Sequence, residues 1–319
     1  MIITLSDPVD VSLSTTGAWT DIDLSGISGY TSAVTGAVIK FMTTASSNRN
    51  FGLRKKGSTD NRTGLIIGQP NGTQAHAYIG VDTSGFIQGY ISDVDMDFYV
   101  VGLITGDVFF TNAVDKSTGT TSSWVDLDIS SDTGADTATH AWFEWSTAAL
   151  VIGAFRKNGS TDDRRAQSPG THGWMGTGVD GSELCEQWIN NAIQDHYLVG
   201  YGTSAMTWHT NAVDRSTSTT GSYQTVTSPD ASAVAAVYDF YTAGSTAYRH
   251  ALRRTGSSVD QYQCLYLRNH ATVTLSSTGG TAEQKVQDVA VDLYELGYWR
   301  ASNNSAPYRQ QMTAAHAAQ

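Results

Sequence analysis

The sequence predicts an all-β protein made of three tandem β-sandwich units of about 100 residues, followed by a short C-terminal tail. Three observations lead to this prediction. Four landmarks recur three times in the same order, and short apolar segments alternate with turns rich in Gly, Ser and Thr. Only 15% of the 319 residues are charged, and no amphipathic helical stretch of more than three turns precedes the last twenty residues.

The first two landmarks lie in the first half of each unit. One is a Val-Asp pair followed nine residues later by an aromatic residue, in "PVDVSLSTTGAW" (8–19), "AVDKSTGTTSSW" (113–124) and "AVDRSTSTTGSY" (212–223). The other is a strand-like segment that ends in a phenylalanine: Phe41, Phe143 or Phe240.

The other two landmarks close each unit. A basic dipeptide follows the phenylalanine by 13 residues, as Arg54-Lys55, Arg156-Lys157 and Arg253-Arg254. An aromatic strand ends the unit, as "DFYVVGL" (97–103), "DHYLVGY" (195–201) and "DLYELGY" (292–298). The spacing predicts units at 1–104, 105–203 and 204–300, and a tail at 301–319.

Each unit is long enough to carry a core of its own. Residues 105–203 read as eight short strands separated by turn residues, which favours a sandwich of jelly-roll-like or immunoglobulin-like topology. Linkers between units are nearly absent, so we expect a stiff, elongated or tightly packed row. The tail is either a frayed end or an arm that orders on a neighbouring subunit.

Composition limits the function. The net charge of −11 argues against nucleic acid as a partner, because phosphate binding needs a basic surface. The sequence contains no apolar run of membrane-spanning length and no secretory signal, which predicts folding in a cytoplasm and no membrane partner. Cys185 and Cys264 have neither metal-type nor disulfide-type spacing, so we expect two buried free thiols.

The basic hairpins hold 10 of the 19 Lys and Arg residues. Asn158-Gly159 predicts a type I′ turn in the second of them. Their cations either pair with nearby aspartates or contact an acidic neighbour such as another subunit; phosphate or a sulfated sugar is a further alternative. The candidate protein-contact residues are Arg54, Lys55, Arg156, Lys157, Arg164, Arg165, Arg253 and Arg254.

Two tryptophans complete the set of candidates. Lys40, Trp142 and Asp239 precede the recurring phenylalanines, and a position that accepts Lys and Asp should face outward. Trp142 is therefore predicted to be exposed in the isolated unit and to mark an interface, whereas Trp145 should face the core with Phe143. If the protein binds a glycan, Trp142 or Trp174 is expected to lie in a shallow groove and to stack on the sugar.

Other chemical groups favour structural roles. We expect His76, His172 and His270 to make structural hydrogen bonds, because one histidine per unit is not a metal site. The acidic stretches 92–97 and 126–136 are solvated loops or, as an alternative, calcium sites. We find no nucleophile elbow, Cys-His constellation, zincin helix or phosphate loop, so neither an enzyme nor a cofactor is predicted.

The hairpin "LRKKGSTDN", the strand pattern W-x-D-x-D and the closing "DFYVVGL" resemble repeats in virion-associated proteins of tailed bacteriophages and prophages. The resemblance implies a non-enzymatic capsid decoration, head-fibre, tail or baseplate protein. It implies assembly in the host cytoplasm, with itself and other virion proteins as partners. The alternative function is a carbohydrate-binding adhesin that recognises a cell-surface glycan.

Overall fold

The structure, a computed structural model, describes residues 1–69, 72–167, 170–203, 206–242, 246, 248–261, 263–265, 268–276 and 279–301. These residues form short strands and one helical turn, α1 (Ser130–Thr133). The predicted C-terminal arm at 301–319 lies, apart from its first residue, outside the described residues.

The strands fall into three consecutive series of eight, which we call units 1, 2 and 3. Unit 1 contains β1 (Ile2–Asp10), β2 (Thr20–Asp23), β3 (Val34–Thr43), β4 (Arg49–Lys55), β5 (Gly64–Ile66), β6 (Thr73–Gly80), β7 (Phe86–Ile91) and β8 (Met96–Thr105). Unit 2 contains β9 (Asp107–Asp115), β10 (Val125–Asp128), β11 (His140–Thr147), β12 (Ile152–Lys157), β13 (Ala166–Gln167), β14 (His172–Gly178), β15 (Leu184–Ile189) and β16 (Gln194–Gly202). Unit 3 contains β17 (Met206–Asp214), β18 (Gln224–Thr227), β19 (Ala233–Tyr241), β20 (Tyr248–Arg254), β21 (Gln263–Leu265), β22 (Arg268–Thr274), β23 (Thr281–Val286) and β24 (Asp292–Arg300).

Each unit contributes two four-stranded antiparallel sheets with the same strand order. In unit 1 the orders are β1-β8-β3-β6 and β2-β7-β4-β5, and units 2 and 3 repeat both. A single parallel pair, Thr73 with Cys264, links β6 of unit 1 to β21 of unit 3. The eight strands predicted within 105–203 are all present as β9–β16.

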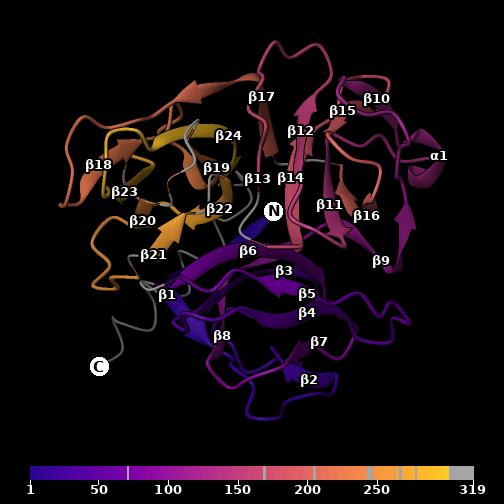
Figure 1. The fold of residues 1–319 in the computed structure, drawn as a ribbon, viewed down its shortest axis with the longest axis horizontal. Helices are drawn as coiled ribbons and strands as arrows, with labels where there is room; N and C mark the ends of the chain where they lie inside the picture. The colour runs from indigo at the N-terminus through magenta and orange to yellow at the C-terminus, as the bar shows by residue number, and fades with distance from the viewer. Residues whose placement is uncertain are drawn as a thin grey trace, which may run out of the picture.

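The prediction of three tandem β-sandwich units is wrong. The chain is all-β, but its six small antiparallel sheets are arranged as the six blades of a β-propeller. Figure 1 shows the three strand series grouped around the middle of the molecule rather than in a row, with unit 1 at the bottom, unit 2 on the right and unit 3 on the left. The strands of one blade are not consecutive in sequence, because each eight-strand series supplies two blades. Whether a single unit folds alone stays a prediction.

Burial differs between the strands near the middle of the molecule and the outer strands. Strands β6 and β14 are buried at every residue, on both faces, whereas the outer strands β7 and β23 alternate between buried and half-buried positions. An outer strand therefore needs apolar residues on one face only. The strands near the middle need packing neighbours on both faces. Their own unit covers one face, and the other two units cover the other face.

The hydrophobic clusters record the same division. Units 2 and 3 have clusters of their own, and Phe143 and Trp145 lie together in the cluster of unit 2, as predicted. The largest cluster joins the core of unit 1 to side chains of both other units, including Trp142, Trp208 and Trp299. The core of this protein is thus shared around its centre.

Candidate functional site at the unit boundaries

The basic hairpins are turns with a fixed geometry. In the first, Ser58 N donates to Lys55 O at 3.1 Å, and Gly57 has a φ of 88°. Gly159 and Gly256 repeat this geometry with φ of 78° and 85°. The predicted type I′ turn is wrong, because Asn158 is not among the residues of positive φ. Positive φ at the third turn position alone is the type II pattern, for which glycine is preferred.

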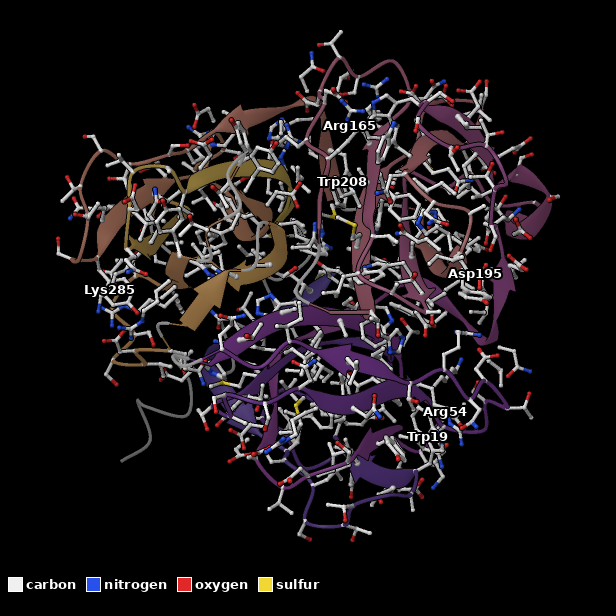
Figure 2. The ribbon with its side chains drawn as sticks, viewed as in Figure 1. Trp19, Arg54, Arg165, Asp195, Trp208 and Lys285 are labelled. Carbon is white, nitrogen blue, oxygen red and sulfur yellow. The ribbon has the colours of Figure 1, made fainter. Side chains whose placement is uncertain are left out.

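The leading arginine of each hairpin lies over an aromatic ring of its own unit. The ring is the aromatic residue that follows the Val-Asp pair in the sequence. The three cation–π pairs and their distances to the ring centroid are Arg54–Trp19 at 4.1 Å, Arg156–Trp124 at 4.1 Å and Arg253–Tyr223 at 3.5 Å. Figure 2 shows Trp19 and Arg54 side by side at the edge of unit 1. Two of the four sequence landmarks thus meet in space in every unit.

The same arginines also bond within their own unit. Arg54 donates to the side chain of Gln88, and Arg156 and Arg253 pair with carboxylates at the equivalent position of the neighbouring strand. Those two ion pairs are Arg156–Glu186 at 2.8 Å and Arg253–Glu283 at 2.7 Å. Pairing with acids of the same unit therefore accounts for Arg156 and Arg253.

The hairpin tips fasten each unit to the first strand of the next. Asn112, on β9 of unit 2, accepts from Ser58 Oγ at 2.9 Å and from Thr59 N at 2.8 Å. Asp60 Oδ2 accepts in return from Ala113 N at 2.8 Å. At the boundary of units 2 and 3 the same bonds recur as Ser160–Asn211, Thr161–Asn211 and Ala212–Asp162. We call these contacts the first and second boundaries.

The arginine eight residues after the leading arginine of each of these hairpins reaches a buried acid of the next unit. Arg62 Nη2 lies 2.7 Å from Glu144 Oε2, and the Arg62 guanidinium lies 4.0 Å from the centroid of the Tyr197 ring. His172 Nε2 lies 2.6 Å from the other Glu144 oxygen. Burial raises the pKa of Glu144, but the bonds from His172 and Arg62 outweigh it and the pKa is lowered. Glu144 is thus a buried carboxylate held by two partners.

The second boundary repeats this arrangement on other residues. Arg164 Nε lies 3.7 Å from the fully buried Asp239, and the guanidinium lies 4.6 Å from the centroid of the Tyr294 ring. His270 Nδ1 lies 2.9 Å from the other Asp239 oxygen. An arginine, a histidine and a tyrosine therefore surround one buried carboxylate at both boundaries.

The boundary between units 3 and 1, the third boundary, has the opposite charge. Gln261 takes the position of the arginine, and its Oε1 accepts from Nζ of Lys40 at 2.6 Å. Ser257 Oγ donates to Asp7 Oδ1 at 2.5 Å, in place of the bonds to asparagine. The three units are thereby joined in a closed ring of contacts.

The remaining basic candidates lie in the same region. Lys55 Nζ donates to Phe109 O of the next unit at 2.8 Å. Arg165 pairs with Asp163 at 2.6 Å and lies over the Trp188 ring, within its own unit. Lys157 and Arg254 line the cavities of the second and third boundaries. Binding of these residues to another subunit stays a prediction.

Trp142 lies at an interface between units of this chain. It is absent from the core of unit 2, so it does face away from its own unit. It is 0% exposed, because its ring stacks on Tyr78 of unit 1 at 4.1 Å and on Trp299 of unit 3 at 5.9 Å. The equivalent Lys40 and Asp239 are buried too. The predicted outward orientation of this position from its unit is confirmed, and in the whole chain the contacts between units bury all three residues.

Trp174 is equally inaccessible. It is 3% exposed and packs against Phe41 and Phe51 of unit 1, at ring distances of 5.9 and 6.1 Å. Neither predicted glycan-stacking tryptophan has a free face in this fold, because stacking on a sugar requires an exposed ring.

The histidines make structural hydrogen bonds, as expected, but they are not equivalent. His76 and His270 lie opposite Lys40 and Asp239 in their sheets, whereas Gly176 lies opposite Trp142. A Cβ at Gly176 would come within 2.3 Å of the Trp142 ring, so only glycine fits there. His172 lies four positions earlier, beside Glu144.

The structure also bears on the predicted metal sites, membrane spans and cysteines. Across the described ranges, no group of three or more His, Cys, Asp or Glu side chains could hold a metal ion. In the same ranges, no helix has the length and apolar character needed to span a bilayer. Cys185 is free and buried, and burial raises the pKa of its thiol; the side chain of Cys264 lies outside the described residues.

A cavity lies beneath each hairpin, at each of the three boundaries. The volumes, open mouths included, are about 380 Å³ at the first boundary, 300 Å³ at the second and 480 Å³ at the third. Sequence reasoning missed the buried members Lys40, Glu144 and Asp239. The sequence signal that could have pointed to the boundary contacts was the repeated "NAVD" at 112–115 and 211–214, whose counterpart at 7–10 reads "DPVD".

Comparison with known proteins adds little. No protein-family model matches the chain, and no curated protein matches it. The chain is similar to a solved structure, the N-terminal CBM22-1-CBM22-2 tandem domain from Paenibacillus barcinonensis Xyn10C, with 8% identity and a TM-score of 0.19. The match covers 62% of this chain and 98% of that one. A likeness this low supports no inference about the fold or the function.

Proposed function

We propose that this chain is a non-enzymatic structural protein of a tailed-bacteriophage virion that acts through protein–protein contacts in a symmetric assembly. The observation that carries the proposal is the closed ring of three similar units. Such a ring presents each surface feature three times around one centre. A partner or lattice with threefold symmetry could engage all three copies at once, and linked contacts strengthen one another.

Three exposed apolar side chains are the contacts we assign to this role. Val94, Ile193 and Val289 lie in the turns before β8, β16 and β24, which are equivalent turns of the three units. They are 60%, 42% and 56% exposed, which makes them three of the most exposed large apolar side chains described. Single exposed apolar residues are common, but three at equivalent turns form a repeated contact.

The boundaries support a structural rather than a catalytic role. Their most buried polar groups are already bonded to one another, as at Glu144 and Asp239. Satisfied buried pairs hold neighbouring elements in one arrangement. Their repetition favours geometry over catalysis, since catalysis needs only one cleft.

Locating the protein in phage particles tests the proposal. Antibody raised against the recombinant chain should label particles that are purified by density gradient from an induced lysate of the source culture. Label at one fixed place on head or tail is the expected result. Protein found only in the particle-free fraction would refute the virion role.

A pair of matched variants tests the contact residues. Replacing Val94, Ile193 and Val289 by Asp should reduce incorporation into particles at least tenfold, while the melting temperature stays unchanged. The control carries the same three added charges on equivalent exposed loop residues: Thr16→Asp, Thr121→Asp and Thr220→Asp. Equal incorporation of both variants would remove these turns from the interface and leave the virion role untouched.

A further inference from the structure

The cavity at the third boundary differs from the other two in its charged groups. It is the largest of the three, at about 480 Å³ with its open mouth included. Lys40 and His76 of unit 1 line it, together with Arg254 and Gln261 of unit 3. Lys40 is 6% exposed and His76 is 9% exposed, so both are buried groups on a cavity wall.

The buried ammonium of Lys40 has no carboxylate partner among the described residues. Its Nζ donates to the neutral Oε1 of Gln261, at 2.6 Å. At the first and second boundaries, by contrast, Glu144 and Asp239 supply a buried carboxylate to an arginine and a histidine. A buried charge without a counter-charge is unfavourable, so this cavity suits an anion.

His76 adds a hydrogen-bond donor of defined orientation. Thr272 N donates to its Nδ1 at 2.7 Å, which assigns the ring proton to Nε2. The Nε2–H group can therefore donate to a ligand in the cavity that His76 lines. His76 stays neutral, because burial lowers its pKa, as do the nearby Lys40, His270 and His250.

Two other charged groups on the cavity wall already have bonding partners. Arg253 pairs with Glu283 and lies over the Tyr223 ring. Asp7, the acid on the wall, accepts from Ser257 Oγ. The half-buried Arg254 adds a second cation to this wall.

We propose that the third-boundary cavity binds a small oxyanion, a carboxylate or a phosphate, between Lys40 Nζ and His76 Nε2. The anion supplies there the negative charge that Glu144 and Asp239 supply at the other boundaries. Charge-assisted hydrogen bonds to an ammonium are among the strongest that a protein forms. Selection between the two classes follows from the number of donors that each can engage, since a phosphate presents more acceptor oxygens.

Ligand-dependent melting tests the proposal on the full chain. Acetate and inorganic phosphate are titrated separately at constant ionic strength, with chloride as the balancing ion, and calorimetry gives the affinity. A saturable rise in melting temperature with either anion is expected. A rise with acetate alone assigns the site to carboxylates, and a rise with phosphate alone assigns it to phosphates. No saturable rise with either would overturn the proposal.

Variants locate the site. Lys40→Met should weaken the affinity at least tenfold, and Lys40→Arg should restore most of it because the positive charge returns. The matched control is Lys157→Met, which removes a half-buried lysine from the wall of the second-boundary cavity and should bind like the wild type. Unchanged binding by Lys40→Met would show that the anion binds elsewhere. If that variant fails to fold, the wild-type protein is titrated with anion and the NMR signal of His76 Nε2–H is followed. A signal that does not shift would overturn the proposal.

Discussion

The second and third boundaries use the same hairpin position and the same strand position with opposite charges. At the second boundary, Arg164 of the hairpin lies 3.7 Å from the buried Asp239. At the third, the neutral Gln261 meets the buried Lys40. The fold thus fixes where two units touch, and the chemistry of the contact can vary if both partners vary together.

A second pair of residues changes in the same way. Asp60 accepts from the backbone N–H of Ala113 at the first boundary. At the third boundary, Val259 stands in place of the aspartate and Pro8 in place of the alanine. Proline has no N–H to donate, so a carboxylate at Val259 would lack its donor. The hairpin and the strand that receives it therefore match at every boundary.

Removing the carboxylate of the first boundary should have the largest effect. Glu144→Ala leaves the buried His172 Nε2 without its partner and leaves Arg62 with Asp60 alone, which should lower the free energy of unfolding by about 3 kcal/mol. Urea denaturation measures the loss. The control is Asp163→Ala, which removes an exposed acceptor of Arg165 and of the Trp124 indole and should cost about 1 kcal/mol or less. Equal losses in the two variants would contradict a special role for the boundary acid.

The third boundary should give the protein a distinctive pH dependence. Burial lowers the pKa of Lys40 from 10.5 to about 7. Between these values the unfolded chain binds the proton and the folded protein does not, so stability should rise with pH by about 1.4 kcal/mol per pH unit. The pH range for this rise is from about 7 to 10.5.

Lys40→Met isolates this contribution. Unfolding free energies are measured in chloride buffers at several pH values across that range, for the variant and the wild type. The difference in unfolding free energy between Lys40→Met and the wild type should fall steadily as the pH rises. Only the wild type has a lysine at position 40 that must lose its proton on folding, and this cost decreases with pH. Parallel pH profiles would mean that Lys40 keeps its ordinary pKa.

Converting the third boundary into the second tests whether the paired residues suffice. Lys40→Asp and Gln261→Arg should each destabilise the protein, since each alone leaves a buried charge unmatched. Together they recreate the pair of Arg164 and Asp239, and a double-mutant cycle should give a favourable coupling of about 1–3 kcal/mol. Additive losses would show that the surrounding boundary does not accept the exchanged pair.

Much of the fold could be predicted from the sequence because its signal is local. The turn glycines, the basic dipeptides and the alternating strands such as β7 depend on neighbouring residues, and all eight strands of unit 2 were found. The arrangement of six blades was missed because it depends on contacts over about a hundred residues or more. The stacking of Trp142 on Tyr78 and Trp299 has no local signature.

The candidate site was predicted in part for a similar reason. The outward orientation of Trp142 from its unit followed correctly from comparing copies, but its burial by the other two units did not follow from them. Lys40 and Asp239 suggested solvent because charged residues are seldom buried alone. Their partners, Gln261 and Arg164, lie in another unit, so the compensation could not be seen from one copy.

The smallest expected effects come from the receiving residue at each boundary. Asn112→Ala removes the acceptor for Ser58 Oγ and Thr59 N and should cost about 1–2 kcal/mol, and Asn211→Ala should cost the same. Asp7→Ala removes one described bond, from Ser257, and should cost less than about 1 kcal/mol. Urea denaturation of the three variants, with the exposed Thr121→Ala as a baseline, measures the ranking. If Asp7→Ala proved as costly as Asn112→Ala, the third boundary would depend on this contact as strongly as the first, and the difference between them would lie in the buried charged residues alone.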